Sequence, residues 1–403
     1  MDSAILNQAM DTKYTKRLEK IEAVLDAWLP EKPDSQWLEK VFGPFSPGAS
    51  PGPFVSSDLA ASLTMPGWDL VKRGGKRWRP LLMLLMAESI TGEAGGEAAL
   101  PLTPLVEFPH NASLIHDDIE DNSDERRGKP AVHLIYGTDT AINSGAFMYF
   151  LPLACLAAWP GKLGGAANPA SANTGAYLDA CLKEQIYTAW ASHMRALHLG
   201  QAMDITWHRD FNSLPSLEEY DRMCRLKTGC LASLAAVLGV YCAFAAKRDF
   251  FTGDFFTGDF FPAESLKALS GFFGEAAEQL GVGFQILDDV KNLDTGIPGK
   301  KRGDDIVEGK KSLPILLYLH RYPEKRDFAA RCFAAARSAG IGAPEVEEII
   351  SALEGEGILE EARDKGLDYI HKSRDIFSAP LAAGFPRQKE GLELLTGLID
   401  LLG

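Results

Sequence analysis

Almost every long segment of this sequence repeats its apolar residues at helical spacing. In residues 15–29, apolar side chains stand at positions 18, 21, 24, 25, 28 and 29, on one face of a helix. The same pattern predicts helices over residues 58–65, 80–91, 104–121, 139–158, 178–207, 217–246, 264–292 and 312–321, and further helices follow beyond residue 321. Convincing strand patterns are absent. We therefore predict an all-α chain that forms one domain over residues 1–403, because no linker isolates a second core.

Two long runs, residues 144–162 and 230–247, are uncharged up to a final lysine. Both fall short of the roughly 20 apolar residues that a membrane span requires, and the first contains Pro152. We expect buried core helices and no stable membrane insertion. The N-terminus shows no signal peptide, and the six cysteines form no C-x-x-C pair. These features are typical of buried free thiols in a cytoplasmic protein.

Three polar or glycine-rich segments interrupt the helices: residues 43–57, 160–175 and 249–261. The first is rich in Pro, Gly and Ser and predicts a loop that completes an N-terminal extension, residues 1–57. The last repeats a five-residue unit, a period too short for a solenoid, and we interpret it as a duplicated loop without chemistry.

The chain of 403 residues carries a formal net charge of −14. This excess of negative charge argues against nucleic acid or an anionic membrane as the main partner. It does not exclude an anionic substrate, because locally placed cations or metal ions can reverse the field at one site.

An acidic segment, residues 113–127, ends in paired arginines. A charge run of this kind is by default a solvated helix end. Here Thr103 and Pro104 predict the N-cap and first turn of the helix that carries it. Asp117 and Asp121 would then share one face, where like charges repel unless a cation compensates. Two carboxylates one turn apart suit Mg²⁺, whose coordination is usually completed by water and substrate phosphates.

A second aspartate pair, Asp288 and Asp289, lies near the end of an otherwise apolar helix. Carboxylates in an apolar wall are unfavourable unless they are paired or metal-bound. If two such helices faced each other, their aspartates would bind divalent ions, and a diphosphate is the natural ligand of such ions. Cations that could bind it are Lys76, Arg79, Arg126, Arg127, Lys227, Lys301 and Lys310. Each alone is by default a surface charge, but together with two aspartate pairs they predict a phosphate site.

Seven motifs occur in the order typical of trans-polyprenyl diphosphate synthases, the family that includes farnesyl and geranylgeranyl diphosphate synthases. They are GGKRWRP (74–80), VEFPHNASLIHDDIED (106–121), RRGKPAVH (126–133), GQAMD (200–204), KTG (227–229), GFQILDDVKN (283–292) and GDDIVEGKKSLP (303–314). The chain resembles this family over residues 70–320, the expected catalytic core. The N-terminal extension and the other two interruptions lie outside it, and residues 321–403 resemble the family only in being helical.

The resemblance implies an antiparallel helical bundle of the isoprenoid-synthase type around a deep central cavity, usually in a homodimer. It implies Mg²⁺-dependent head-to-tail condensation of isopentenyl diphosphate with an allylic diphosphate, with three Mg²⁺ ions per active site. The residues suit this chemistry, because breaking the allylic C–O bond leaves a diphosphate anion and a carbocation. Metal ions and cationic side chains on the leaving group lower that barrier.

The same resemblance assigns roles to individual residues. The Mg²⁺ ligands would be Asp117, Asp121 and Asp288, supported by Asp118 and Asp289. The allylic diphosphate would be held by Arg126, Lys227 and Lys301. Isopentenyl diphosphate would be held by Lys76, Arg79, His110 and Arg127, with Gly75 allowing close backbone approach. Oxygen dipoles would be turned toward the carbocation by Thr228 and Gln285; Gln201 and Asp204 would support the site from behind, and Lys310 would add a phosphate contact.

Three positions depart from the family pattern. Asn292 stands where the second aspartate motif usually ends in aspartate, a change that some geranylgeranyl-type members share. Pro109 removes a hydrogen bond from the helix of the first motif and should kink it. The segment before GDDI is one residue short, which leaves Lys300 and Lys301 as alternatives for one phosphate contact, and we prefer Lys301.

Two other classes of protein remain as alternatives. A class I terpene cyclase also uses an aspartate-rich helix, but it needs no second diphosphate site and usually has a different second metal motif. A catalytically inactive, prenyl-diphosphate-binding regulatory subunit would be expected to have lost an aspartate or Arg126, and both are retained.

Product length is predicted from Ser113 and Ala112, four and five residues before Asp117. They lie one helical turn, about 5.4 Å, below the metal site. Both are small, whereas a family member that stops at farnesyl length commonly has an aromatic residue there. We therefore expect geranylgeranyl diphosphate. Aromatic residues that could close the tunnel further down, or belong to the ordinary core, are Phe108, Phe147, Tyr149 and Phe150.

Overall fold

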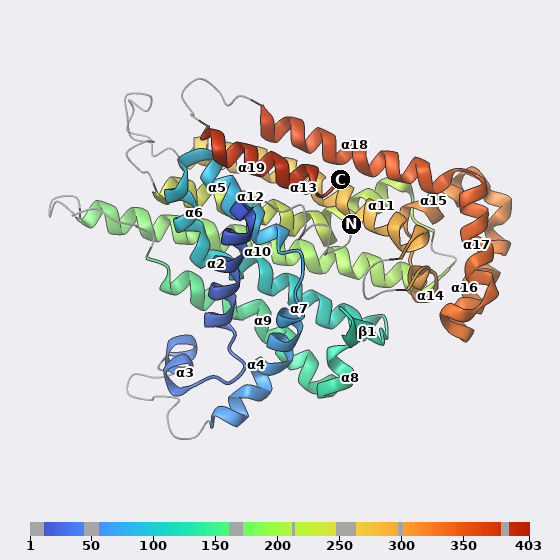
Figure 1. Ribbon diagram of the computed structural model, residues 1–403, viewed down its shortest axis with the longest axis horizontal. Helices are drawn as coiled ribbons and strands as arrows, with labels where there is room; N and C mark the ends of the chain where they lie inside the picture. The colour runs from blue at the N-terminus through green and yellow to red at the C-terminus, as the bar shows by residue number, and fades with distance from the viewer. Residues whose placement is uncertain are drawn as a thin grey trace.

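The protein is described by a computed structural model over residues 12–43, 56–160, 172–211, 214–246, 263–296, 301–379 and 387–403. These residues are almost entirely helical (Figure 1), which confirms the all-α prediction. The predicted loops at 43–57 and 160–175 lie mostly, and the repeat at 249–261 wholly, outside the described residues.

The helices agree closely with the helical periodicity of the sequence. The α-helices are α2 (Thr12–Trp28), α3 (Ser35–Phe42), α4 (Ser57–Lys72), α5 (Trp78–Thr91), α6 (Glu93–Ala99), α7 (Pro104–Glu120), α8 (Val132–Tyr136), α9 (Thr138–Ala158), α10 (Ala172–Arg209), α11 (Leu217–Cys224), α12 (Cys230–Ala246), α13 (Ala263–Asp294), α14 (Asp304–Glu308), α15 (Leu313–Arg321), α16 (Arg326–Ala339), α17 (Pro344–Gly355), α18 (Ile358–Ser378) and α19 (Lys389–Asp400). Most of the short helices, such as α6, α8 and α14, escaped prediction because they hold too few turns to show a period.

Helix α4 runs further than predicted because a hydroxyl from another helix repairs the gap left by a proline. The periodic pattern ended just before Pro66, yet the helix continues. Ser144, on α9, donates its hydroxyl to Leu63 O at 2.8 Å and accepts from the Gly67 N–H at 3.3 Å. The hydroxyl thus joins the carbonyl and the N–H on either side of the proline, the two groups that a regular helix bonds to each other.

Helix α7, which carries the first aspartate motif, begins at Pro104 with Thr103 at the N-cap position, as predicted, but the threonine hydroxyl does not cap the helix. Thr103 has helical backbone angles (φ −55°, ψ −30°), and its hydroxyl donates to Leu100 O at 2.8 Å. A 3₁₀ turn, Leu100–Leu102, precedes the helix and keeps Thr103 out of the extended conformation that an N-cap needs. The helix continues through Pro109, and the kink expected there stays a prediction.

The buried apolar side chains form two clusters that meet along α13. The larger cluster joins α2, α5, α7, α9, α10, α12 and α19 with the first half of α13, up to Leu280. The smaller one joins α11 and α14–α17 with the second half of α13, from Val282 onward. Among the described residues, the long helices α10, α13 and α18 contribute to both clusters, and the one-domain interpretation stays a prediction.

Two helical stretches are long and apolar enough to cross a membrane, Thr138–Ala158 and Leu217–Ala246. In the second, 89% of the most apolar window is buried within the protein, as the prediction of a core helix requires. In the first, α9, only 50% of that window is buried, so this helix presents an apolar face to the outside.

Candidate active site

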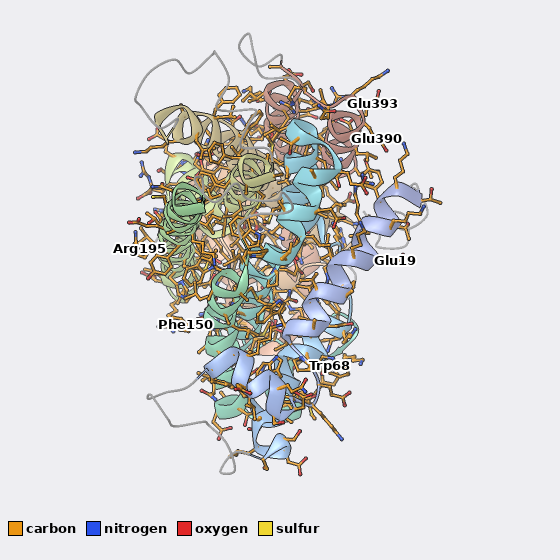
Figure 2. The ribbon with its side chains drawn as sticks, turned by 90° about the vertical axis from the view of Figure 1, so that its left-hand side faces the viewer. Glu19, Trp68, Phe150, Arg195, Glu390 and Glu393 are labelled. Carbon is orange, nitrogen blue, oxygen red and sulfur yellow. The ribbon has the colours of Figure 1, made fainter. Side chains whose placement is uncertain are left out.

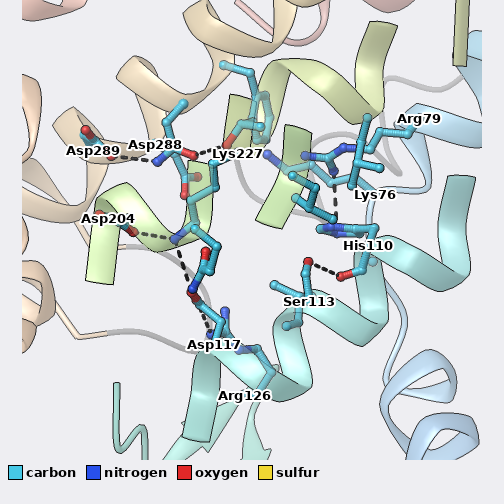
Figure 3. A pocket seen from close by; sticks show the side chains of 18 of the residues that line it. Lys76, Arg79, His110, Ser113, Asp117, Arg126, Asp204, Lys227, Asp288 and Asp289 are labelled. Atoms are coloured by element: carbon cyan, nitrogen blue, oxygen red, sulfur yellow. Dashed lines mark hydrogen bonds and ion pairs between the residues drawn. The ribbon is translucent and has the colours of Figure 1, made fainter. Parts of the chain in front are cut away.

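A cavity of about 590 Å³ opens between α5 and α7 on one side and α10, α12 and α13 on the other (Figure 3). Most of the predicted site residues line it, although they come from segments far apart in the sequence. They are Gly75, Lys76, Arg79, His110, Asp117, Arg126, Arg127, Gln201, Asp204, Lys227, Thr228, Gln285, Asp288, Asp289 and Lys310.

Three predicted residues do not line this cavity. Asp118 is fully buried behind its wall and accepts from Arg126 Nε at 2.7 Å. Asp121 lies beside Lys310, whose Nζ is 3.2 Å from Asp121 Oδ2. Lys301 is exposed, and its backbone N–H donates to Asp304 Oδ2 at 2.7 Å. Its alternative, residue 300, lies outside the described part of the chain.

On one side of the cavity the cations are already paired with the aspartates. Lys227 Nζ lies 3.1 Å from Asp117 Oδ1 and also contacts Asp204 Oδ2, while Gln201 donates to Asp117 Oδ1 at 2.9 Å. Burial alone would lower the pKa of Lys227, but Asp117 and Asp204 more than reverse this and raise it. The pKa of Arg126 is likewise raised, because the attraction of Asp118 outweighs the effect of burial. This side of the cavity is therefore compensated in charge.

On the other side Lys76, Arg79 and Arg127 face no carboxylate within ion-pair distance, counting only described residues. Lys76 Nζ lies 4.7 Å from the ring centre of Phe284, and Arg79 Nη1 lies 3.5 Å from His110 Nε2. Burial lowers the pKa of Arg79 and of Arg127 to about 10 each. Burial, followed by the neighbouring arginines, holds the pKa of His110 well below its usual value, so His110 is neutral. The result is uncompensated positive charge, which an anion would neutralise.

A short hairpin that the sequence prediction missed separates the two neighbouring arginines. Strands β1 (Glu125–Arg126) and β2 (Lys129–Pro130) pair antiparallel across a two-residue turn, in which Arg127 and Gly128 have φ of 54° and 74°. Arg126 turns to the buried aspartate of α7, whereas Arg127 Nη1 donates to Leu70 O at 3.0 Å and to Asn111 Oδ1 at 3.2 Å. The glycine in the second turn position was the only sequence signal.

A π-helical turn, Arg225–Gly229, carries Lys227 between α11 and α12. Two helices approach this turn through glycines. A Cβ on Gly200 of α10 would lie 2.4 Å from Lys227 N, and one on Gly281 of α13 would lie 2.6 Å from Gly229 Cα. Single π turns inside helices occur frequently at functional sites. Here the close packing of three backbones fixes the lysine over the aspartates.

The two aspartates of the second motif have different surroundings. Asp288 faces the cavity, whereas Asp289 is buried and accepts from Tyr220 OH at 2.6 Å and from Gln285 Nε2 at 2.8 Å. Burial raises the pKa of Asp289 to about 6. Thr228 donates its hydroxyl to Gln285 Oε1 at 2.7 Å. Asp289 therefore orients Gln285, which in turn orients Thr228.

Sequence reasoning missed two further contacts and left one substitution without a structural reason. Tyr220 was not considered, and neither was His208, whose Nε2 lies 2.6 Å from Asp204 Oδ1 and whose Nδ1 lies 3.5 Å from Asp121 Oδ1. The only signal for His208 was its place one turn after Asp204.

Asn292 accepts from the Asp305 N–H at 3.2 Å through Oδ1. It anchors the backbone of the GDDI segment, a task that an amide performs without a charge.

The carboxylates do not form a ready-made metal cage. Within the described residues, no three Asp, Glu, His or Cys side chains converge closely enough to hold an ion by themselves. Instead Asp117 stands on α7 and Asp288 on α13, and both line the cavity. This donor set fits a hard cation such as Mg²⁺, which takes one or two carboxylates together with phosphate oxygens and water.

Residues 60–351 match the sequence profile of the family described as polyprenyl synthetase. The chain belongs to this family. The family predicted from seven motifs is thus confirmed, and the match extends beyond the expected core, residues 70–320, at both ends. The confirmed activity is that of a prenyltransferase, which joins isoprenoid diphosphates by trans-prenyl condensation.

Relatives and solved structures agree with this assignment. The sequence is 29% identical to geranylfarnesyl diphosphate synthase from Aeropyrum pernix, covering 83% of this chain and 91% of that protein. It is 32% identical to geranylgeranyl pyrophosphate synthase from Neocamarosporium betae, covering 73% of each. The fold resembles geranylgeranyl pyrophosphate synthetase from Pyrococcus horikoshii, with a TM-score of 0.67, 24% identity and coverage of 96% and 97%. The predicted isoprenoid-synthase bundle is confirmed.

The packing of the π turn leads to a first prediction. Gly200→Ala should lower kcat at least about tenfold, because the new methyl group would collide with the backbone at Lys227 and displace its ammonium group. The measurement is steady-state turnover, with circular dichroism to verify helix content.

Gly271→Ala, on α13, is the matched control, since no atom of the described residues lies within 4 Å of its Cβ position. It should keep full activity. Normal turnover in Gly200→Ala would show that the close packing on the π turn is not required.

Proposed function

We propose that this prenyltransferase condenses isopentenyl diphosphate head-to-tail with an allylic diphosphate and that the reaction depends on Mg²⁺. The observation that carries the proposal is the difference between the two sides of the cavity. The side with paired aspartates and cations suits a diphosphate that arrives with metal ions. The side with unpaired cations suits a diphosphate that binds without them. A terpene cyclase, which takes one diphosphate, would not need the second.

Mg²⁺ would be held by Asp117, Asp121 and Asp288, with Asp118 and Asp289 in support, as three ions per site. When bound, it supplies positive charge to the leaving diphosphate. Arg126 and Lys227 stand beside these aspartates, so they meet the same diphosphate without a large rearrangement. Lys310, next to Asp121, adds a further contact. The role of Lys301 requires its exposed side chain to turn toward the cavity.

Isopentenyl diphosphate would bind to Lys76, Arg79 and Arg127, with neutral His110 beside them. Three cations without carboxylate partners bind a dianion or trianion strongly, because no existing ion pair has to be broken first. Gly75 has a φ of 148°, and the absence of a side chain leaves its backbone open to a phosphate. This assignment gives the two arginines of the hairpin different substrates.

The carbocation would be stabilised by neutral oxygens rather than by a carboxylate, which could capture it. Thr228 directs its proton to Gln285 Oε1, so lone pairs of the hydroxyl oxygen are free for the cavity side. Gln285 is held in this orientation by Asp289. The apolar side chains of Leu114, Leu197 and Phe284 also line the cavity and exclude water from the reacting carbon atoms.

A direct assay tests the reaction. With isopentenyl diphosphate, an allylic diphosphate and Mg²⁺, the protein should form a longer prenyl diphosphate, and chelation of the metal should abolish turnover. Asp288→Ala should lower kcat about a hundredfold or more while helix content is retained. Asp294→Ala is the control on the same helix, since among the described residues its carboxylate pairs with Arg363 on the surface.

Turnover that persists in the chelator, or in Asp288→Ala, would exclude the proposed metal site. A hydrocarbon product instead of a prenyl diphosphate would favour the cyclase. No product with a retained affinity for prenyl diphosphates would favour an inactive regulatory subunit.

We propose geranylgeranyl diphosphate as the product. Ser113 lines the cavity and is small, while Ala112 is fully buried beside it. Of the aromatic residues considered as a floor, Phe150 is 65% exposed and Phe108 is fully buried in the core. Several relatives bear the name geranylgeranyl pyrophosphate synthase, which supports the same length.

Ser113→Phe should shorten the product to farnesyl diphosphate, because the ring would fill the cavity one turn below the aspartates. Products are identified as prenyl alcohols after phosphatase treatment. Ser351→Phe, an exposed serine of α17, is the control and should leave the product unchanged. An unchanged product in Ser113→Phe, or a wild-type protein that stops at farnesyl diphosphate, would contradict this proposal.

We also propose a homodimer whose interface includes the outer face of α9. Along this helix an apolar stripe reaches the surface at helical spacing: Ile142, Ala146, Phe150, Leu153 and Ala157. Phe150 of α9 and Arg195 of α10 lie on the same side of the molecule (Figure 2). On α10, Tyr187 and Leu199 are 51% and 58% exposed. Exposed apolar residues on these two helices favour contact with a second copy of the chain.

Phe150→Glu should convert the dimer to a monomer, because it places a charge in the centre of the apolar stripe. Light scattering after size-exclusion chromatography gives the mass. Ser351→Glu, at an exposed position of α17, is the control and should leave the mass unchanged. A wild-type monomer would contradict the proposal.

The protein is proposed to act in the cytoplasm on small diphosphates. Its six cysteines are all free thiols, as expected for a reducing compartment. The net charge of −14 argues against nucleic acid as its main partner.

A further inference from the structure

Arg77 is a buried arginine inside the loop that carries Gly75, Lys76 and Arg79. It is 4% exposed, and its φ of 47° is unfavourable for a residue other than glycine. The other cationic side chains of this region make the electrostatic potential around Arg77 more positive. A buried charge in an unfavourable backbone conformation persists only when the surroundings hold it in place.

Two carboxylates from different helices hold the guanidinium of Arg77. Glu107 Oε1, on α7, accepts from Nη1 at 2.8 Å. Glu22 Oε1, on α2, accepts from Nε at 2.6 Å. The carbonyl oxygen of Val71 accepts from Nη2 at 2.6 Å. Every nitrogen of the guanidinium therefore has a partner, and the loop is fastened to α2 and α7.

The contacts continue from Arg77 to the proposed isopentenyl diphosphate site. Glu107 Oε1 also accepts from Asn111 Nδ2 at 2.9 Å, and Asn111 Oδ1 accepts from Arg127 Nη1 at 3.2 Å. The two guanidinium groups share the space beside Gly75. A Cβ there would lie 3.1 Å from Arg127 Nη2 and 3.2 Å from Arg77 Nη1. A shift of Arg77 would therefore move Arg127.

Helix α2 lies outside the part of the chain that matches the family profile, residues 60–351. It crosses the side of the bundle formed by α5 and α7 (Figure 1). Other anchors hold it further from the site: Arg17 donates from Nε to Glu88 Oε2 at 2.9 Å, and Tyr14 donates to Leu394 O at 2.8 Å. The docking of α2 can thus be weakened without touching Glu22.

We propose that Glu22, in the N-terminal extension, is a positioning residue for the isopentenyl diphosphate site and acts through Arg77 on Lys76, Arg79 and Arg127. This inference rests on the proposed function. It gives the N-terminal helix a part in substrate binding. Without Glu22 the loop loses one of its two anionic partners, and the cations beside it are no longer held at the distances that the diphosphate requires.

The test compares steady-state kinetics of three variants of α2 in the full-length protein. Glu22→Ala should raise KM for isopentenyl diphosphate about three- to twentyfold, the range for losing one charge-assisted hydrogen bond that is partly exposed. KM for the allylic diphosphate and kcat at saturation should stay within about twofold of wild type, since Glu22 does not touch the aspartate side.

Two variants separate positioning from mere stability. Glu19→Ala removes the same charge from an exposed position on α2, where Glu19 is labelled in Figure 2, and should change neither KM. Arg17→Ala breaks a comparable ion pair of α2 and should lower the thermal midpoint as Glu22→Ala does, without the selective rise in KM. Equal kinetic effects in Arg17→Ala and Glu22→Ala, or equal rises in both KM values, would overturn the inference.

Arg127→Ala provides the reference for the site itself. If it raises KM for isopentenyl diphosphate selectively and Glu22→Ala does not, the site stands and the role of Glu22 is wrong. If Arg127→Ala has no selective effect, the assignment of the two diphosphate sites is wrong, and the inference falls with it.

Discussion

The pairing of Lys227 with Asp117 and Asp204 is the interaction on which the rest of the site depends. It joins α7, α10 and the π turn across the cavity, and the three side chains are only 9–20% exposed. A buried lysine with two carboxylates is stable only if both stay in place, because losing one leaves uncompensated charge. The close backbone packing at Gly200 and the contacts of Gln201 hold them there. The aspartate side of the cavity is therefore organised before any ligand arrives.

The uneven distribution of charge explains how one cavity can distinguish two similar ligands. Both proposed substrates carry a diphosphate, so shape at the phosphate end cannot separate them. Aspartates attract metal ions and, through them, a diphosphate, whereas Arg79 and Arg127 attract a diphosphate directly. The hairpin of β1 and β2 keeps these environments apart, although its two arginines are neighbours in the sequence.

Much of this arrangement could be predicted from the sequence, and the exceptions share a physical cause. Helices such as α7, α10 and α13 bury one face over many turns, so the helical spacing of their apolar residues is easy to recognise in the sequence. Most residues of the aspartate and lysine motifs also line the cavity, because long helices carry their residues in fixed register, although Asp118 and Asp121 do not. The β-hairpin and the π turn hold too few residues to show a period. His208, Tyr220 and Glu22 act through contacts with distant segments, and periodicity contains no information about such pairs. The exposed position of Lys301 depends on a loop, where the chain has no register at all.

Pro66 and Ser144 have a consequence for how this sequence can change over time. With another residue at 66, the backbone of α4 could complete its own hydrogen bonds. The buried hydroxyl of Ser144 would then lose its hydrogen-bond partners, which is unfavourable. With an apolar residue at 144, the break at Pro66 would stay open. Each residue is favourable only in the presence of the other. Relatives of this protein should therefore exchange the two positions together, or pass through a less stable intermediate, even though the residues lie in different helices.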